Sequence, residues 1–144
     1  MENNDIQEIA KKKRYLKRYR KNRACVNRLE EKLYLLDERI KSVRTSSLSG
    51  MPRGSVPVTI DNLLSDKADL EDRIKRLQRK GKTFKAEILE EIDSLDDPRY
   101  CEILEAYFID CLSIDDIAER EAYTPRHIYR LYDKAVTLLA LNRQ

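Results

Sequence analysis

The spacing of apolar residues between Val26 and Val43 restricts the possible folds of this chain more than any other feature. They recur at alternating intervals of three and four positions: Val26, Leu29, Leu33, Leu36, Ile40 and Val43. This is the a/d seam of a coiled coil, because it returns an apolar side chain to one helix face every 3.5 residues. A long helix is therefore expected from about Ile6 to Val43. Before Val26 the seam becomes polar, so that end should fray or meet a different partner.

A second helix is expected to start near Thr59 or Asp61 and to run to about Leu95. One heptad frame collects Ile60, Leu63, Leu70, Ile74, Leu77, Phe84, Ile88 and Leu95, and it is interrupted at Lys67, Gly81 and Glu91. Between the two patterns, residues 45–58 gather Ser, Gly and Pro and predict a loop. Helices of similar length joined in this way favour an antiparallel hairpin. Because such a hairpin buries little surface, we expect a homo-oligomer formed through the coiled coil.

Three shorter helices are predicted after Asp97, at about 98–111, 113–121 and 125–141. The start of the first has Asp97 as a cap and Pro98 at its first position. Ser113 and Asp116 have the spacing of a capping box for the second. Thr124, followed by Pro125, can cap the third. Apolar residues on the last two helices fit a face-to-face crossing with small Ala118 at the contact, which is the layout of a helix-turn-helix.

Composition agrees with this organisation. Charged residues make up 38% of the chain and aromatic residues 7%, and three Gly and four Pro are too few for a β-rich fold with many turns. The predicted fold class is all-α, with a coiled-coil hairpin over residues 1–95 and a helix-turn-helix domain over residues 96–144.

If Ile128, Leu131 and Ala135 face inward, a polar face of the last helix is left outside. The candidate DNA-binding residues are Thr124, Pro125, Arg126, His127, Tyr129, Arg130 and Lys134. The second helix of a helix-turn-helix meets base edges near its N-terminus, where Arg126, His127 and Arg130 lie. Thr124 with nearby N–H groups suits a phosphate, as do Tyr129 and Lys134. The alternative is an ordinary polar face, and Asp133 would repel phosphate.

Positive charge is concentrated elsewhere in the chain. Residues 1–44 hold 14 Lys and Arg against 7 Asp and Glu, whereas residues 96–144 hold 6 against 10. This acidic balance counts against the C-terminal segment as a DNA binder by itself. The cations crowd into Lys11, Lys12, Lys13, Arg14, Lys17, Arg18, Arg20, Lys21 and Arg23. They predict a helix that lies against nucleic acid or an acidic protein, or else a solvated coiled-coil end.

Other classes of function lack support in the sequence. No apolar run approaches a membrane span and the N-terminus has no signal-peptide pattern, so a cytoplasmic protein is expected. A single His and no CxxC motif argue against a metal site. Cys101 and Cys111, expected on one helix, would be too far apart for a disulfide. There is no phosphate-binding Gly-rich loop and no recognisable catalytic set, so neither an enzyme nor a cofactor is expected.

The stretch SIDDIAEREAYTPRHIYRLYDKAVTLL resembles the fourth region of bacterial sigma factors, which reads promoter −35 elements. With SSLSGMPRG at 46–54 and LDDPRY at 95–100, nearly the whole chain is similar to the ArpU- and RinA-type regulators of phage late genes in Gram-positive bacteria. This resemblance implies a phage or prophage transcriptional regulator that binds double-stranded DNA and acts with host RNA polymerase. Two residues depart from the pattern: Ala122 replaces a Gly in the turn, and Glu121 replaces a Leu before it.

A second function remains open. The acidic balance of the C-terminal segment also suits an interaction module that binds RNA polymerase or another phage protein without contacting DNA.

Overall fold

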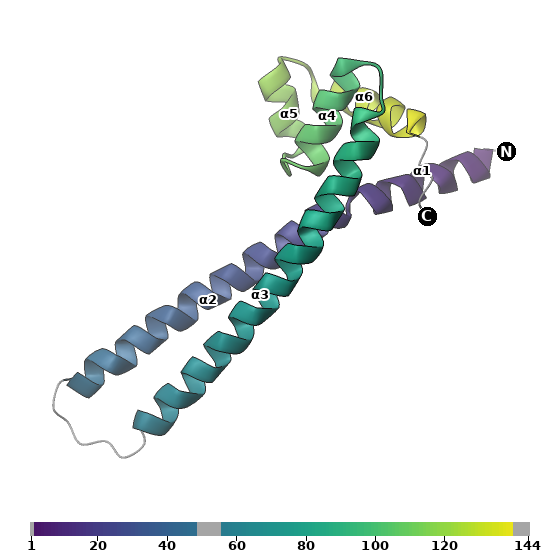
Figure 1. The fold of residues 1–144 in the computed structure, drawn as a ribbon. Helices are drawn as coiled ribbons and strands as arrows, with labels where there is room; N and C mark the ends of the chain where they lie inside the picture. Colours follow the sequence, from purple (N-terminus) through teal and green to yellow (C-terminus); the bar gives the residue numbers. More distant parts are fainter. Residues whose placement is uncertain (1, 49–55, 140–144) are drawn as a thin grey trace. The chain divides into compact units, whose positions relative to one another are not determined.

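The computed structural model describes residues 2–48 and 56–139, and in these ranges every regular element is an α-helix. The helices are α1 (Glu2–Leu16), α2 (Arg18–Leu48), α3 (Val56–Asp93), α4 (Pro98–Phe108), α5 (Ile114–Glu121) and α6 (Pro125–Leu138), shown in Figure 1. The predicted all-α class, with a long helical hairpin followed by a three-helix segment, is confirmed.

Several predicted boundaries move. The first long helix begins earlier and ends later than predicted, and residues 45–48 and 56–58 of the expected loop are helical. The rest of that loop, with its Met-Pro-Arg-Gly motif, lies outside the described residues. The first helix is also interrupted at Lys17. There the Arg18 side chain donates from Nε to the Tyr15 carbonyl at 2.9 Å. A side chain that inserts into the backbone hydrogen-bond ladder is a common cause of such an interruption.

The chain forms two compact units, and they do not follow the boundary expected near residue 95. One unit contains residues 1–21 together with 81–144, which we call the terminal unit, and the other contains residues 22–80, which we call the hairpin unit. The start of the first helix and the end of α3 therefore pack with the short helices. The polar end of the seam has met a different partner, one of the two outcomes expected for it.

The hairpin unit is an antiparallel pair formed by α2 and α3. Its buried centre is Val26, Leu29 and Ile74, with Cys25, Leu33, Leu70 and Leu77 packed around it. Lys67, which breaks the apolar frame of α3, lies 2.8 Å from the Asp37 carboxylate. The hydrogen bond and charge of Asp37 raise the pKa of Lys67. A cation at a seam position is thus accommodated by a partner on the neighbouring helix.

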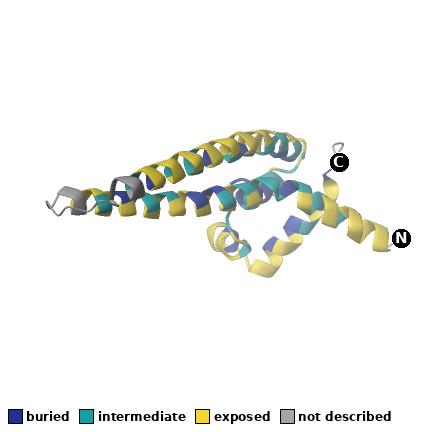
Figure 2. Ribbon diagram, turned by 90° about the horizontal axis from the view of Figure 1, so that it is seen from below, coloured by how far each residue is buried: buried dark blue, intermediate teal, exposed yellow. Residues whose placement is uncertain are grey.

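The terminal unit holds the larger core. Fully buried side chains from α1, from the end of α3 and from the short helices meet there: Leu16, Ile88, Ile92, Leu104, Phe108, Ile117, Ile128, Val136 and Leu139. Buried residues are dark blue in Figure 2. Phe84 and Ile88, expected in the coiled-coil seam, belong to this core. At the end of α6, Val136 and Leu139 are buried, whereas Leu138 is 60% exposed.

The short helices begin where the sequence indicates. The Asp97 side chain accepts from the Arg99 N–H, and Ser113 and Asp116 form the reciprocal capping box of α5. Thr124 caps α6 by accepting from the His127 N–H at 3.2 Å, with Pro125 as the first helical residue. Helices α4 and α6 end three residues before their predicted ends, at Phe108 and Leu138, and α5 ends at the predicted Glu121. Each cap satisfies an N–H that the helix itself leaves unpaired.

Candidate functional site

Two helices, α5 and α6, form a helix-turn-helix in the terminal unit. Ile117 and Ala118 of α5 are buried with Ile128 of α6. Ala122 adopts a left-handed conformation in the turn (φ 59°, ψ 38°), and the Tyr123 N–H donates to the Ala118 carbonyl at 2.9 Å. This six-to-one bond is the closing contact of a Schellman motif. The turn therefore keeps the geometry expected of glycine although alanine occupies the position.

All seven candidate residues of this motif are exposed. These are Thr124, Pro125, Arg126, His127, Tyr129, Arg130 and Lys134. On the opposite side Ile128, Leu131 and Ala135 are buried, as their spacing predicted. Nothing among the described residues pairs with the side chains of Arg126, Arg130 or Lys134. These three follow one another at four-residue intervals, so they form a single row of cations along the helix.

An aromatic contact lies at the N-terminal end of α6. Tyr123 precedes the Thr124 cap and is 44% exposed rather than buried in the contact between the two helices. Its ring instead meets His127 edge-on, with 4.8 Å between the ring centroids. This contact places the imidazole at the rim of the motif, in the first turn of α6, which is expected to meet a ligand.

The basic helix α1 lies against one side of α6. Lys13 Nζ is 2.7 Å from Asp133 Oδ1, and it lies 4.9 Å from the centroid of the Tyr132 ring. Burial raises the pKa of the Tyr132 phenol, so this ring stays neutral beneath the ammonium group. Lys12 Nζ donates to the Thr137 carbonyl at 3.1 Å. The carboxylate expected to repel phosphate therefore has a cation beside it, which sequence reasoning did not foresee.

Two further cations of the basic segment anchor it to the terminal unit. Arg18 Nη2 lies 2.8 Å from Glu87 Oε2, and its guanidinium stacks 3.9 Å from the centroid of the Tyr15 ring. Arg20 Nη1 donates to the carbonyls of Tyr107 and Leu112 at 2.7 and 2.9 Å. Tyr107 is in the last turn of α4, where a cation is favoured by the helix dipole. Arg18 and Arg20 therefore stabilise the packing of the basic segment in addition to contributing positive charge.

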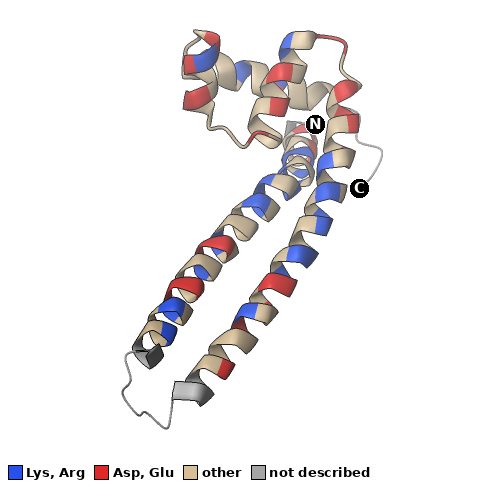
Figure 3. Ribbon diagram, turned by 60° about the vertical axis from the view of Figure 1, so that its left-hand side comes forward, with Lys and Arg blue, Asp and Glu red and all other residues tan. Residues whose placement is uncertain are grey.

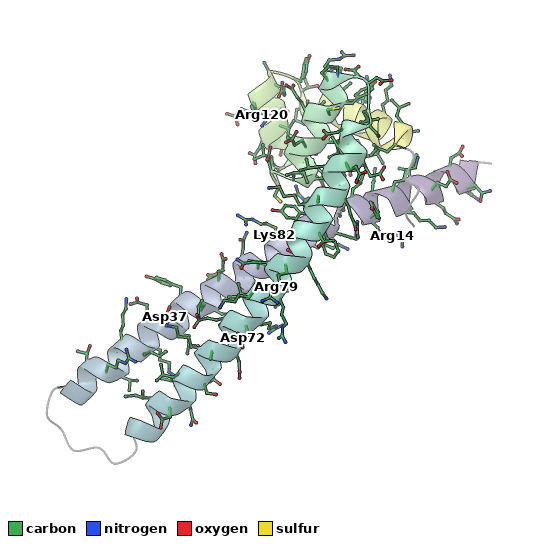
Figure 4. All side chains as sticks on the ribbon, viewed as in Figure 1. Arg14, Asp37, Asp72, Arg79, Lys82 and Arg120 are labelled. Carbon is green, nitrogen blue, oxygen red and sulfur yellow. The ribbon has the colours of Figure 1, made fainter. Side chains whose placement is uncertain are left out.

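The remaining cations of the segment have no such role. Lys11, Arg14, Lys17 and Lys21 make no side-chain hydrogen bond or ion pair with another described residue, and Arg14 is labelled in Figure 4. Arg23, the ninth, belongs to the hairpin unit. The sequence predicted one patch of nine cations. In the structure, four of them hold the segment in place: Lys12, Lys13, Arg18 and Arg20.

Acidic residues cover much of the first helix of the motif. Asp115, Asp116 and Glu119 of α5 are exposed, and Glu121 pairs with Arg120 at 3.3 Å between Oε1 and Nε. Figure 3 shows this distribution of red residues on α5. The helix-turn-helix therefore has one helix with an acidic surface and one with a cationic row.

Other kinds of site find no support in the described ranges. No described helix is long and apolar enough to cross a bilayer. No three potential metal ligands come together in residues 2–48 and 56–139. Cys25, Cys101 and Cys111 carry free thiols. Cys101 and Cys111 were expected on one helix, but α4 ends at Phe108, before Cys111.

An open cavity of about 380 Å³ is lined by Tyr100, Asp133, Lys134, Thr137 and Leu138.

Comparison with known proteins gives one partial similarity. No family model matches the sequence, and no solved structure matches it. The chain is 30% identical over 124 residues to the A subunit of DNA gyrase from Helicobacter pylori. The matched region covers 84% of this chain and 15% of the gyrase protein. Because the chain spans so small a share of that protein, the similarity leaves its family open.

Proposed function

We propose that this chain binds double-stranded DNA through α6 and acts as a phage-encoded transcriptional regulator with host RNA polymerase, in the bacterial cytoplasm. The observation that carries the proposal is the exposed row of Arg126, Arg130 and Lys134 on a helix whose other side is buried. An α-helix fits the major groove of B-DNA, and the second helix of a helix-turn-helix is the one that enters it. The similarity to a DNA gyrase and the resemblance to phage regulators are in line with this function.

The residues of α6 divide by position. Arg126 and Arg130 reach base edges from the first turns of the helix, and a bidentate arginine–guanine pair contributes about 1–3 kcal/mol of discrimination. Thr124 accepts the His127 N–H, so its hydroxyl hydrogen remains available for a phosphate oxygen. Pro125 presets the first turn, and Tyr129 and Lys134 contact the DNA backbone. Lys13 reduces the repulsion that Asp133 would otherwise exert on phosphate.

A gel-shift experiment with fragments of the genome that encodes the protein tests this proposal. The double variant Arg126→Ala plus Arg130→Ala should lose the difference between specific and unrelated duplexes. A matched control, Arg39→Ala plus Arg73→Ala, removes the same charge from exposed positions of the hairpin unit and should retain that difference. Specific binding that survives the first double substitution unchanged would remove α6 from the reading role.

The second candidate function is an interaction module that binds RNA polymerase or a phage protein without touching DNA. The acidic surface of α5, formed by Asp115, Asp116 and Glu119, favours it. A tagged protein that captures polymerase after nuclease treatment, and that shifts no duplex at low salt, would select this function over DNA binding. Capture that disappears with nuclease would instead mean that DNA bridges the two proteins.

Self-association through the hairpin unit is part of the proposal. Tyr34 and Leu35 on α2 are 64% and 61% exposed, and large apolar side chains on a two-helix hairpin favour a further helical partner. A symmetric dimer would present two copies of α6 to two half-sites. Sedimentation of the wild-type chain and of Tyr34→Gln plus Leu35→Gln distinguishes the possibilities. A wild-type monomer at high concentration would refute self-association.

A further inference from the structure

We infer that the basic segment at the end of α1 and the start of α2 carries a second DNA contact. Four cations of this segment form the contact: Lys11, Arg14, Lys17 and Lys21, which we call the outer strip. The outer strip binds the phosphate backbone beside the groove occupied by α6. The inference rests on the proposed DNA binding and adds to it a separate element with its own chemistry.

The outer strip occupies one side of the helical segment that carries it. At about 100° per residue, the four cations fall on one side of it, away from the fully buried Leu16. Lys12 and Lys13 lie outside this arc and contact α6. The segment thus has two kinds of cation: those that anchor it to the terminal unit, and those on the outer side without a side-chain partner among the described residues.

Side-chain contacts attach α1 to the proposed reading helix. Lys13 contacts α6 at Asp133 and Tyr132, and on the helical wheel of α6 these two residues lie to one side of the row formed by Arg126, Arg130 and Lys134. Lys12 meets the Thr137 carbonyl, beyond the C-terminal end of the row. Helix α1 therefore flanks the row and leaves Arg126 and Arg130 open. A duplex that binds along α6 therefore also runs next to α1, which is attached to the Asp133 side of that helix.

The outer strip lies in a strongly cationic stretch of the chain. No acidic residue occurs between Glu8 and Glu30, so the outer strip has no carboxylate on its own helical segment within that stretch. Ten residues of helix span about 15 Å, and B-DNA carries one phosphate charge per about 1.7 Å of its axis. The four cations thus lie roughly 5 Å apart, and the same 15 Å of duplex carries about nine phosphate charges, so each cation of the strip has a phosphate within reach. The acidic helix α5 makes the need for such compensation greater.

Salt dependence of binding separates this contact from the reading role. Each phosphate contact adds about 0.9 to the slope of log K against log salt, so replacing four cations with Gln should reduce that slope by about 3 to 4. The ratio of specific to nonspecific affinity should stay within about twofold, because phosphate contacts carry no sequence information. The double variant Arg126→Ala plus Arg130→Ala should show the opposite pattern, with the ratio collapsing.

A matched control replaces Lys32, Arg39, Lys75 and Lys80 with Gln. It removes the same four charges from exposed positions of the hairpin unit, and its slope should change by less than about 1, one phosphate contact. If the wild type binds specifically while the outer-strip variant keeps the full slope, the inference is wrong and the proposed function stands. Such a result would leave an acidic protein surface or plain solvation as the role of the strip. If the wild type binds no duplex, both fail. Equal circular dichroism spectra verify that all variants are folded.

Discussion

The turn between α5 and α6 makes a sharp prediction about stability. Ala122 is held at φ 59° and ψ 38°, a region that costs a residue with a Cβ atom roughly 1–2 kcal/mol. Replacing it with Gly removes this cost. Gly also gains freedom in the unfolded chain, which offsets the benefit by about 0.4–1 kcal/mol. Because the Ala122 side chain is exposed, no core contact is lost.

The expected net effect of Ala122→Gly is a stabilisation of about 0.5–1 kcal/mol. For a domain of this size, that change raises the melting temperature by about 2–8 °C. Urea unfolding followed by circular dichroism in the far ultraviolet measures it, with an unchanged m-value as the check that the unfolding reaction is the same. The Schellman bond from the Tyr123 N–H to the Ala118 carbonyl should persist, since Gly keeps the backbone donor.

The same substitution at a helical position gives the control. Ala86 is exposed on α3 in the terminal unit, and Gly there should destabilise by about 1 kcal/mol because it weakens a regular helix. The two Ala→Gly substitutions should therefore differ in sign. A destabilisation by Ala122→Gly equal to that of Ala86→Gly would show that the left-handed turn does not form in solution, and the geometry proposed for α6 would lose its basis.

Three further predictions concern caps and the attachment of α1. Removing the α6 cap with Thr124→Ala should cost about 1 kcal/mol and weaken DNA binding, as measured by urea unfolding and gel shift; Thr124→Ser should restore both. The hydrogen bonds from Arg99 lower the pKa of Asp97, so the stabilisation from this carboxylate is present near neutral pH and is lost as pH falls below about 4; Asp97→Asn should reduce the acid sensitivity of the unfolding midpoint. A double-mutant cycle of Lys13→Ala and Asp133→Ala should give a coupling energy of about 0.2–1 kcal/mol that decreases with salt, and a coupling near zero would mean that the pair does not hold α1 to α6.

Local signals in the sequence were sufficient for much of the fold. The heptad spacing from Val26 predicts the hairpin, because a repeat of 3.5 residues has few other structural solutions. The caps at Asp97, Ser113 and Thr124 were predictable for a similar reason, since each depends on residues within one helical turn. Exposure of Arg126 and Arg130 followed from the helical period once the buried face of α6 was known.

Long-range packing was not predictable in this way. The heptad frame of α3 continues past Gly81 to Phe84 and Ile88, yet these residues pack in the core of the terminal unit. A heptad pattern specifies which face of a helix is apolar and contains no information about the partner. The basic segment shows the same limit: composition reveals nine cations, but their division into anchors and an outer strip depends on acceptors far away in the chain, such as Asp133 and Glu87.

The sequence alone therefore determined that the chain is helical, where its short helices start, and which side of α6 is polar, because these properties depend on neighbours a few residues away. Only the tertiary structure decided that α1 joins the helix-turn-helix, that Lys13 lies beside Asp133, and that Arg20 binds the end of α4. The physical reason is that burial and ion pairing are set by which surfaces meet in space, and a periodic pattern along one helix is compatible with many partners.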